Sequence, residues 1–199
     1  MKFASAVRSV TNPMATLVLM HGLGSDEQDM RGFADMLDDR FDVVCLRAPQ
    51  RYGPGYAWFD IQWTVRGIEI DPDQYWQSVE AVAEYFKEQN FERLILGGFS
   101  QGAMMSLGVI TKHPDLAKGA VLLSGRGIDD ICPAFDGPIF HAHGAFDDVI
   151  SVEYAYVLRR NLSQLGDRYE FHEYEMGHWI NEEEVADLNR WLARFLEIE

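Results

Sequence analysis

The most constraining feature of this sequence is a regular alternation of short apolar runs with amphipathic stretches. The apolar runs are rich in leucine and β-branched residues, as strands buried on both faces of a parallel sheet are. We expect such strands at residues 15–21, 41–48, 93–99, 119–125 and 138–144. Residues 169–176 alternate apolar with polar side chains, which favours a strand nearer the edge of the sheet.

Between these runs the apolar residues recur at helical spacing. The expected helices cover residues 25–39, 71–90, 101–114, 151–166 and 181–199. Ser25 is a suitable N-cap for the first of them, and Gly166 a suitable C-cap for the fourth. This alternation predicts an α/β fold with a mostly parallel sheet and helices on both faces. The length and the absence of a linker-like tract predict one domain over residues 1–199.

Composition excludes several classes of partner. A formal charge of −15 argues against nucleic-acid binding and against purely electrostatic binding to anionic lipid. The sequence contains no apolar stretch long enough to span a membrane and no lipidation signal, so we expect no stable membrane anchor. The N-terminus does not resemble a signal peptide, and the two cysteines lack metal-ligand spacing; we therefore expect a cytoplasmic protein without a metal, with Cys45 in the core.

The segment GGFSQGAMM places Ser100 between an expected strand and an expected helix. Gly98 to Gly102 match G-x-S-x-G, the nucleophile elbow of α/β-hydrolases, and this strand–turn–helix context is the one the motif requires. Glycines on both sides leave room for a serine at a strained turn. The first N–H groups of the following helix can stabilise an oxyanion.

A serine nucleophile needs a base, and the base needs an acid to orient it. In this fold the chain order is Ser, then Asp or Glu, then His. His178 suits the base because it lies in the loop between the last strand and the last helix. Asp147 and Asp148 both follow the strand at 138–144, and spacing alone does not choose between them as the acid.

Two N–H groups are candidates for an oxyanion hole. The N–H of Gln101 follows the serine directly, and the glycine-rich segment LMHGLGSDE offers the N–H of Leu23. The glycines could equally mark an ordinary tight turn, but together with the Ser–Asp–His order they favour an oxyanion hole.

Six motifs occur in one order: VLMHGLGSDEQDM, RAPQRYGPGYAWFDI, GGFSQGAMM, VLLSG, HGAFDDVIS and EMGHWI. With them the chain resembles the phospholipase/carboxylesterase family, which includes the acyl-protein thioesterases, and is most similar to its small bacterial esterases. The resemblance implies an α/β-hydrolase fold without a separate lid domain, Ser100 as nucleophile, His178 as base, and Leu23 and Gln101 as oxyanion donors. The family pattern H-G-x-x-D favours Asp147 as the acid. The AWFD segment makes Trp58 a candidate substrate contact, although a large core aromatic is an equal interpretation.

The chain also departs from the family pattern. Ser151 stands where the family often has proline, and is expected to be a helix N-cap. Asp148 puts a second acid beside the expected catalytic one. Arg126 follows LLSG near the strand ends, where it is either a solvated loop residue or a contact for an anionic part of the substrate. The long apolar channel of lipid-handling members cannot be located in the sequence.

The main hypothesis is a serine carboxylesterase or thioesterase that forms an acyl-serine intermediate on a small-molecule ester or thioester. No cofactor is implied, since the three triad residues supply the chemistry, and a homodimer is left open. The alternative is a catalytically weak protein of the same fold that binds a small molecule. Cleavage of a peptide or lactone is a third option.

Overall fold

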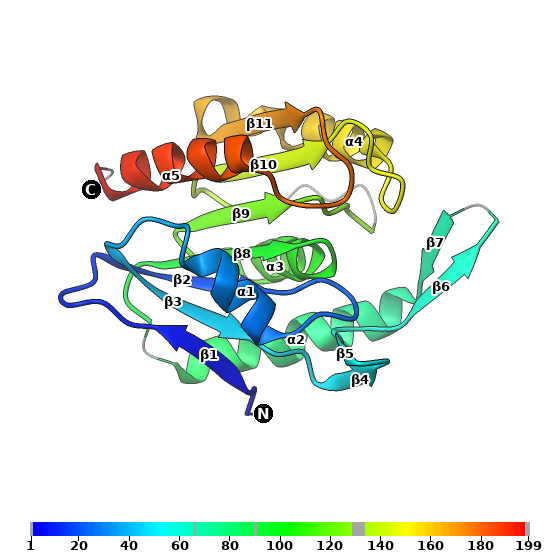
Figure 1. The fold of residues 1–199 in the computed structure, drawn as a ribbon, viewed down its shortest axis with the longest axis horizontal. Coiled ribbons are helices and arrows are strands. Elements are labelled where there is room, and N and C mark those ends of the chain that lie inside the picture. Colours follow the sequence, from blue (N-terminus) through cyan, green and yellow to red (C-terminus); the bar gives the residue numbers. More distant parts are fainter. Residues whose placement is uncertain (1, 66, 90, 129–133, 198–199) are drawn as a thin grey trace.

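The computed structural model describes residues 2–65, 67–89, 91–128 and 134–197. A seven-stranded sheet lies at its centre, in the order β1-β3-β2-β8-β9-β10-β11 (Figure 1). Every neighbouring pair is parallel except β1 and β3, so the sheet is mostly parallel as predicted. Its strands are β1 (Ser5–Arg8), β2 (Ala15–Met20), β3 (Phe41–Leu46), β8 (Leu94–Phe99), β9 (Gly119–Leu123), β10 (Ile139–Gly144) and β11 (Tyr169–Tyr174).

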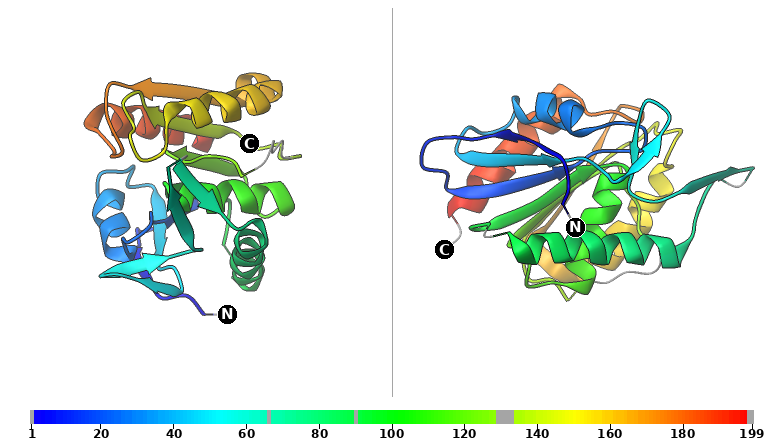
Figure 2. Two further views of the ribbon diagram at one scale, coloured as in Figure 1. Left: turned by 90° about the vertical axis from the view of Figure 1, so that its right-hand side faces the viewer. Right: turned by 90° about the horizontal axis from the view of Figure 1, so that it is seen from below.

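Helices cover both faces of this sheet (Figure 2). One face packs against α1 and α5, and the other against α2, α3 and α4. None of the helices in the described ranges combines the length and apolarity that a membrane crossing requires. The helices are α1 (Glu27–Ala34), α2 (Pro72–Glu88), α3 (Gln101–Lys112), α4 (Val152–Leu162) and α5 (Glu182–Glu197), with a 3₁₀ helix, η1 (Ser163–Arg168), after α4.

The continuous apolar runs arise because each central strand is buried on both faces. In β2, Leu17 and Leu19 pack toward α1 and α5, whereas Val18 and Met20 pack toward the opposite helices. All six residues of β2 are buried. Cys45 in β3 is buried as expected, and burial raises the pKa of its thiol to about 12. Cys132 lies outside the described residues.

Three elements of the structure have no counterpart in the sequence-based prediction. The antiparallel edge strand β1 is one, and two hairpins are the others: β4 (Gln50–Tyr52) with β5 (Gly55–Ala57), and β6 (Ile61–Thr64) with β7 (Gly67–Ile70). Their strands are short and lack a long apolar run, so hydrophobic periodicity does not reveal them. The second hairpin projects from the carboxyl end of the sheet, at the right of Figure 1.

Two of the helix caps named from the sequence differ from the structure, and α1 ends at Ala34 rather than at residue 39. The N-cap of α1 is Asp26, whose carboxylate accepts from two backbone N–H groups, while the Ser25 hydroxyl donates to Asp29 instead. Gly166 does not end α4: it lies inside η1 with a positive φ of 58°. The N-cap of α4 is Ser151, as expected.

Glu184, in the first turn of α5, is a fully buried carboxyl group. Neither of its carboxyl oxygens has a hydrogen-bond partner within the described ranges. Burial raises the pKa of this group to about 8, against a reference value of 4.5. The unfolded state therefore loses this proton at lower pH than the folded state, and stability falls as pH rises from about 4.5 to about 8.

Glu184→Gln is expected to remove this pH dependence. Because a neutral amide carries no buried charge, the variant should be more stable than the wild type above pH 8, by roughly 2–5 kcal/mol, and close to it below pH 4.5. Urea midpoints at both ends of this range measure the difference. Glu183→Gln, at the exposed neighbouring position, is the control. A Glu184→Gln profile parallel to that of the wild type would contradict the prediction.

Candidate active site

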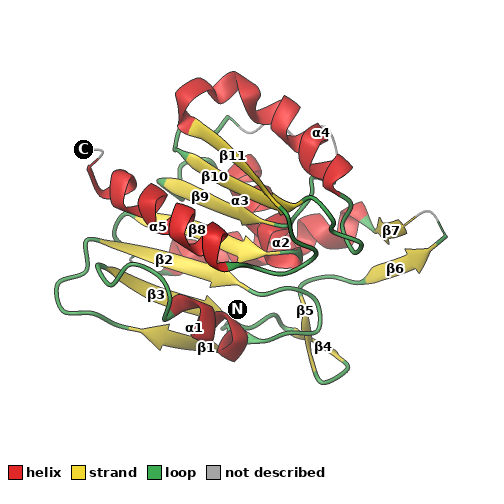
Figure 3. Cartoon of the chain, turned by 45° about the horizontal axis from the view of Figure 1, so that its top comes forward, coloured by secondary structure: helices red, strands yellow, loops and turns green. Residues whose placement is uncertain are grey.

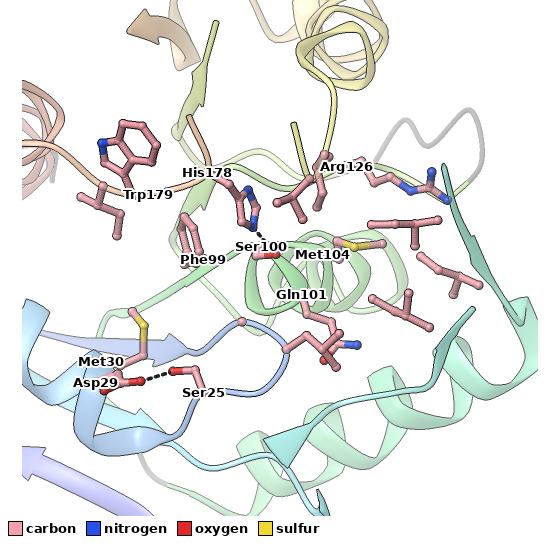
Figure 4. Close-up of a pocket in the computed structure, with 18 of the residues that line it drawn as sticks. Ser25, Asp29, Met30, Phe99, Ser100, Gln101, Met104, Arg126, His178 and Trp179 are labelled. Carbon is pink, nitrogen blue, oxygen red and sulfur yellow. Dashed lines mark hydrogen bonds between the residues drawn. The ribbon is translucent and has the colours of Figure 1, made fainter. Parts of the chain in front are cut away.

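Ser100 forms the tight turn between β8 and α3. Its φ of 56° and ψ of −116° are strained for a residue with a side chain. The flanking glycines are sterically required. A Cβ at Gly98 would lie 2.4 Å from the carbonyl carbon of Gly102, and one at Gly102 would lie 1.9 Å from the carbonyl oxygen of Met20. The turn thus brings the Ser100 hydroxyl to the wall of a pocket at the carboxyl edge of the sheet (Figure 4).

The structure brings Ser100, His178 and Asp147 into one hydrogen-bonded chain. His178 Nε2 lies 2.9 Å from Ser100 Oγ, and His178 Nδ1 lies 2.7 Å from Asp147 Oδ2. A carboxylate only accepts, so Nδ1–H donates to Asp147 and leaves Nε2 to accept the proton of the serine hydroxyl. Asp148 is exposed and makes no contact of this kind with any residue in the described ranges. The geometry thus separates two aspartates that spacing left equal.

Further hydrogen bonds fix the Asp147 carboxylate. Its Oδ1 accepts from the backbone N–H groups of Val149 at 2.9 Å and Ile150 at 2.7 Å. Nε2 of the buried His143 lies 3.3 Å from Oδ2 and 2.7 Å from the carbonyl oxygen of Ile150. Burial by itself would raise the pKa of Asp147, but the hydrogen bonds from His143, His178 and Ile150 outweigh it and hold the pKa well below its usual range. Asp147 is therefore a charged acceptor at neutral pH.

Leu23 and Gln101 both line the pocket beside Ser100. Gln101 is the first residue of α3, where a backbone N–H has no acceptor within the helix. Across the described part of the chain, neither of these two N–H groups has an acceptor. Both expected donors are thus free to bind a developing oxyanion.

His21, one residue before Gly22, is a site residue that the sequence analysis missed. Its Nε2 accepts from the N–H of Ala48 at 3.0 Å, so its Nδ1–H donates to the carbonyl oxygen of Gly22 at 2.7 Å. Burial lowers the pKa of this imidazole and keeps it neutral. The Gly22 carbonyl and the Leu23 N–H belong to the same trans peptide and point in opposite directions. His21 therefore orients the Leu23 N–H. His21 is the first residue of the HGLG motif, so the sequence did contain a signal for this role.

His21→Phe is expected to lower kcat by roughly 10- to 100-fold with little change in KM, because the Leu23 peptide loses its anchor while its N–H remains present. Steady-state hydrolysis of nitrophenyl butyrate, corrected for the folded fraction, measures this effect. His113→Gln, at the exposed end of α3, is the control. Equal kcat in His21→Phe and the wild type would show that the Leu23 peptide does not need this anchor.

The structure corrects the expectation that Trp58 contacts the substrate. Trp58 is completely buried and is absent from the pocket wall. Its indole N–H donates to the carbonyl oxygen of His21 at 2.9 Å, and its backbone N–H donates to Oε1 of Gln101 at 2.8 Å. Gln101 Nε2–H in turn donates to the carbonyl oxygen of Phe59 at 2.7 Å. Trp58 is therefore a core residue, as the alternative interpretation predicted. It links the oxyanion loop, which carries His21 and Leu23, to the turn at Ser100.

The pocket next to Ser100 has a volume of about 390 Å³ and is mainly apolar. Its apolar wall on one side comes from the hairpin β6–β7 and α3, through Ile61, Trp63, Ile68, Ile70 and Met104. Additional apolar lining comes from α1, β8 and the loop after His178, through Met30, Phe33, Phe99, Trp179 and Ile180. The sequence did not reveal this lining, because a pocket wall assembled from separate segments leaves no continuous pattern. Figure 3 shows the hairpin beyond the carboxyl ends of the strands.

Comparisons with known proteins give one consistent result. A family model described as Phospholipase/Carboxylesterase matches residues 2–196. Acyl-protein thioesterase 1 of Kluyveromyces lactis is 31% identical over 225 residues, covering 98% of this chain and 98% of that protein. Acyl-protein thioesterase 1 of Candida albicans is 29% identical over 232 residues, with 97% and 98% covered. The crystal structure of a Bacillus cereus carboxylesterase shares the fold, with a TM-score of 0.82 and 21% identity, covering 97% of this chain and 94% of that one.

Proposed function

This chain belongs to the phospholipase/carboxylesterase family of α/β-hydrolases and is an ester or thioester hydrolase, and we propose that it acts through an acyl intermediate on Ser100. The observation that carries this proposal is the hydrogen-bonded chain from Ser100 Oγ through His178 to Asp147. The substrate is a small carboxylic ester or thioester. The cytoplasmic location and the oligomeric state stay predictions from the sequence.

In the first half of the reaction His178 Nε2 takes the proton of the Ser100 hydroxyl as the oxygen attacks the substrate carbonyl. The imidazolium that forms is stabilised by the Asp147 carboxylate on its other side. The carbonyl oxygen becomes an oxyanion, which the N–H groups of Leu23 and Gln101 bind. The tetrahedral intermediate then collapses, His178 returns the proton to the alcohol or thiol, and the acyl group stays on Ser100.

In the second half water replaces the alcohol or thiol. His178 takes a proton from the water, the resulting hydroxide attacks the acyl-serine carbonyl, and the same two N–H groups bind the oxyanion again. Collapse releases the carboxylic acid and returns the proton to Ser100. Both halves of the reaction begin with a neutral His178 imidazole in the correct orientation. The hydrogen bond from Nδ1–H to Asp147 maintains this orientation.

Labelling with a fluorophosphonate tests the proposal directly, because this probe phosphonylates an activated serine. We expect rapid labelling of the wild type, with the modified peptide containing Ser100, and none of Ser100→Ala. Ser25→Ala is the matched control, since Ser25 also lines the pocket but lies outside the hydrogen-bonded chain. Absence of labelling in folded wild-type protein would instead favour the alternative of a binding protein that does not turn over its ligand.

A further inference from the structure

The two ends of the pocket carry opposite charges. Figure 4 shows Ser100 between Asp29 on one side and Arg126 on the other. Asp29 accepts a hydrogen bond from the Ser25 hydroxyl at 2.7 Å. Between Ser100 and the Arg126 end, Met104 contributes to the pocket wall (Figure 4). A ligand group that enters this side of the pocket therefore passes along an apolar wall and meets a cation.

Arg126 is an arginine of the pocket wall without a carboxylate partner among the described residues. Other arginines form ion pairs with carboxylates, namely Arg31, Arg40, Arg47, Arg168, Arg190 and Arg194. Over the described ranges Arg126 has no acidic partner, and its Nε is buried without a hydrogen-bond acceptor. A buried donor of a charged group without an acceptor is costly. Because this Nε is closed off from solvent, a ligand in the pocket would instead meet the terminal Nη–H groups of Arg126.

The guanidinium is held in place by an aromatic ring. Its central carbon lies 4.5 Å from the centroid of the Tyr154 ring in α4, a cation–π geometry. This contact restrains the direction of the side chain. Figure 4 shows the head group directed away from Ser100, on the side where Met104 lies. The cation is thus placed at a distance from the reacting serine rather than beside it.

We propose that Arg126 determines substrate specificity by binding a carboxylate at the far end of the acyl chain. The preferred substrates are then monoesters or monothioesters of dicarboxylic acids, with the scissile carbonyl at Ser100 and the methylene groups along Met104 and the hairpin β6–β7. This inference rests on the proposed function. The charge of −15 on the whole chain repels anions at long range, so a local cation is needed to select them.

A pair of chromogenic substrates tests the proposal. The 4-nitrophenyl monoester of suberic acid has a free carboxylate at its end, and its methyl ester is a neutral substrate of similar shape. In the wild type we expect kcat/KM to be roughly 10- to 100-fold higher for the anionic substrate, the size of one charge-assisted hydrogen bond. Arg126→Gln should abolish this preference. An equal ratio in Arg126→Gln and the wild type would overturn the proposal.

Matched variants separate a local contact from a general charge effect. Arg159→Gln removes the same charge outside the pocket wall and should keep the wild-type ratio. Tyr154→Phe retains the ring under the guanidinium and should show the wild-type ratio. Tyr154→Leu removes the ring and should lower the ratio. If Arg159→Gln lost as much of the preference as Arg126→Gln, the net charge of the protein and not a local contact would select the anionic substrate. The proposed contact with Arg126 would then be wrong.

The same assay distinguishes failure of this inference from failure of the proposed function. If the wild type hydrolyses the neutral ester in a Ser100-dependent manner but shows no preference for the anionic one, the specificity proposal is wrong and the proposed reaction stands. If instead Arg126→Gln selectively slows esters whose leaving group carries the carboxylate, the placement of the acyl chain is wrong. If Ser100→Ala hydrolyses the neutral ester as fast as the wild type, the proposed function itself is wrong.

Discussion

Ser100→Ala is expected to lower kcat for nitrophenyl esters by roughly 10⁶-fold, because no other group at this position can form the acyl intermediate. The side-chain oxygen that accepts the acyl group is lost, while the pocket and both oxyanion N–H groups remain. KM should change little, since the ligand contacts persist. Initial rates with short-chain nitrophenyl esters measure the loss, and the residual rate serves as the background for every other variant.

A double variant tests whether Ser100 and His178 work as one unit. His178→Ala alone should cost nearly as much as Ser100→Ala, and combining the two should cost little more than either. The reason is that an imidazole without the serine has no proton to take, and a serine without the base is not activated. Losses that multiply in the double variant would show that the two residues act independently, contrary to the geometry at 2.9 Å.

Asp147→Asn is expected to lower kcat by roughly 10⁴-fold without loss of fold. The backbone N–H groups of Val149 and Ile150 bind Oδ1, so the amide nitrogen takes the place of Oδ2 next to His178. An amide N–H donates to His178 Nδ1, which forces the other tautomer and places a proton on Nε2. This nitrogen can then no longer accept the proton of Ser100. The measurement is kcat together with the melting temperature.

Asp148→Asn is the matched control for this prediction, because Asp148 is the exposed neighbour with the same side chain. We expect its kcat to stay within about twofold of the wild type, as surface substitutions commonly leave a protein close to its starting state. A large loss in Asp148→Asn with a small loss in Asp147→Asn would reverse the assignment of the acid, which the 2.7 Å hydrogen bond from His178 supports.

The expected parallel strands of the sheet could be read from the sequence because burial on both faces produces a continuous apolar run. Residues 15–21 and 93–99 were expected as strands, and the structure places β2 and β8 there, side by side. The antiparallel strand β1 was not predicted from the sequence. This strand is only four residues long and partly exposed, so it carries no clear apolar pattern. It forms because it pairs with β3, which is distant in the sequence.

The elbow is the part of the site that the sequence specified most fully. Local sterics decide it: a serine at positive φ between a strand and a helix requires Gly98 and Gly102, and both are visible in the sequence. The prediction of His178 rested on chain order together with its place in the loop between the last strand and the last helix. The role of its neighbour Asp147 did not follow from spacing, because Asp147 and Asp148 differ only in the direction of the side chain, which the turn after β10 sets.

Tertiary packing alone decided the surroundings of the serine. The fate of Trp58 was open in the sequence, since an aromatic residue packs equally well in a core or a pocket, and the structure buries it between His21 and Gln101. The apolar wall of the pocket also leaves no pattern in the sequence, because the hairpin β6–β7 and the helix α3, which form it, come from separate segments of the chain. The parallel strands and the reactive turn at Ser100 could be predicted from the sequence, because periodic burial and local sterics leave their mark on consecutive residues. The meeting of Asp147 with His178, the support of the oxyanion loop by His21 and Trp58, and the pocket wall depend on contacts between distant segments, which only the folded chain brings together.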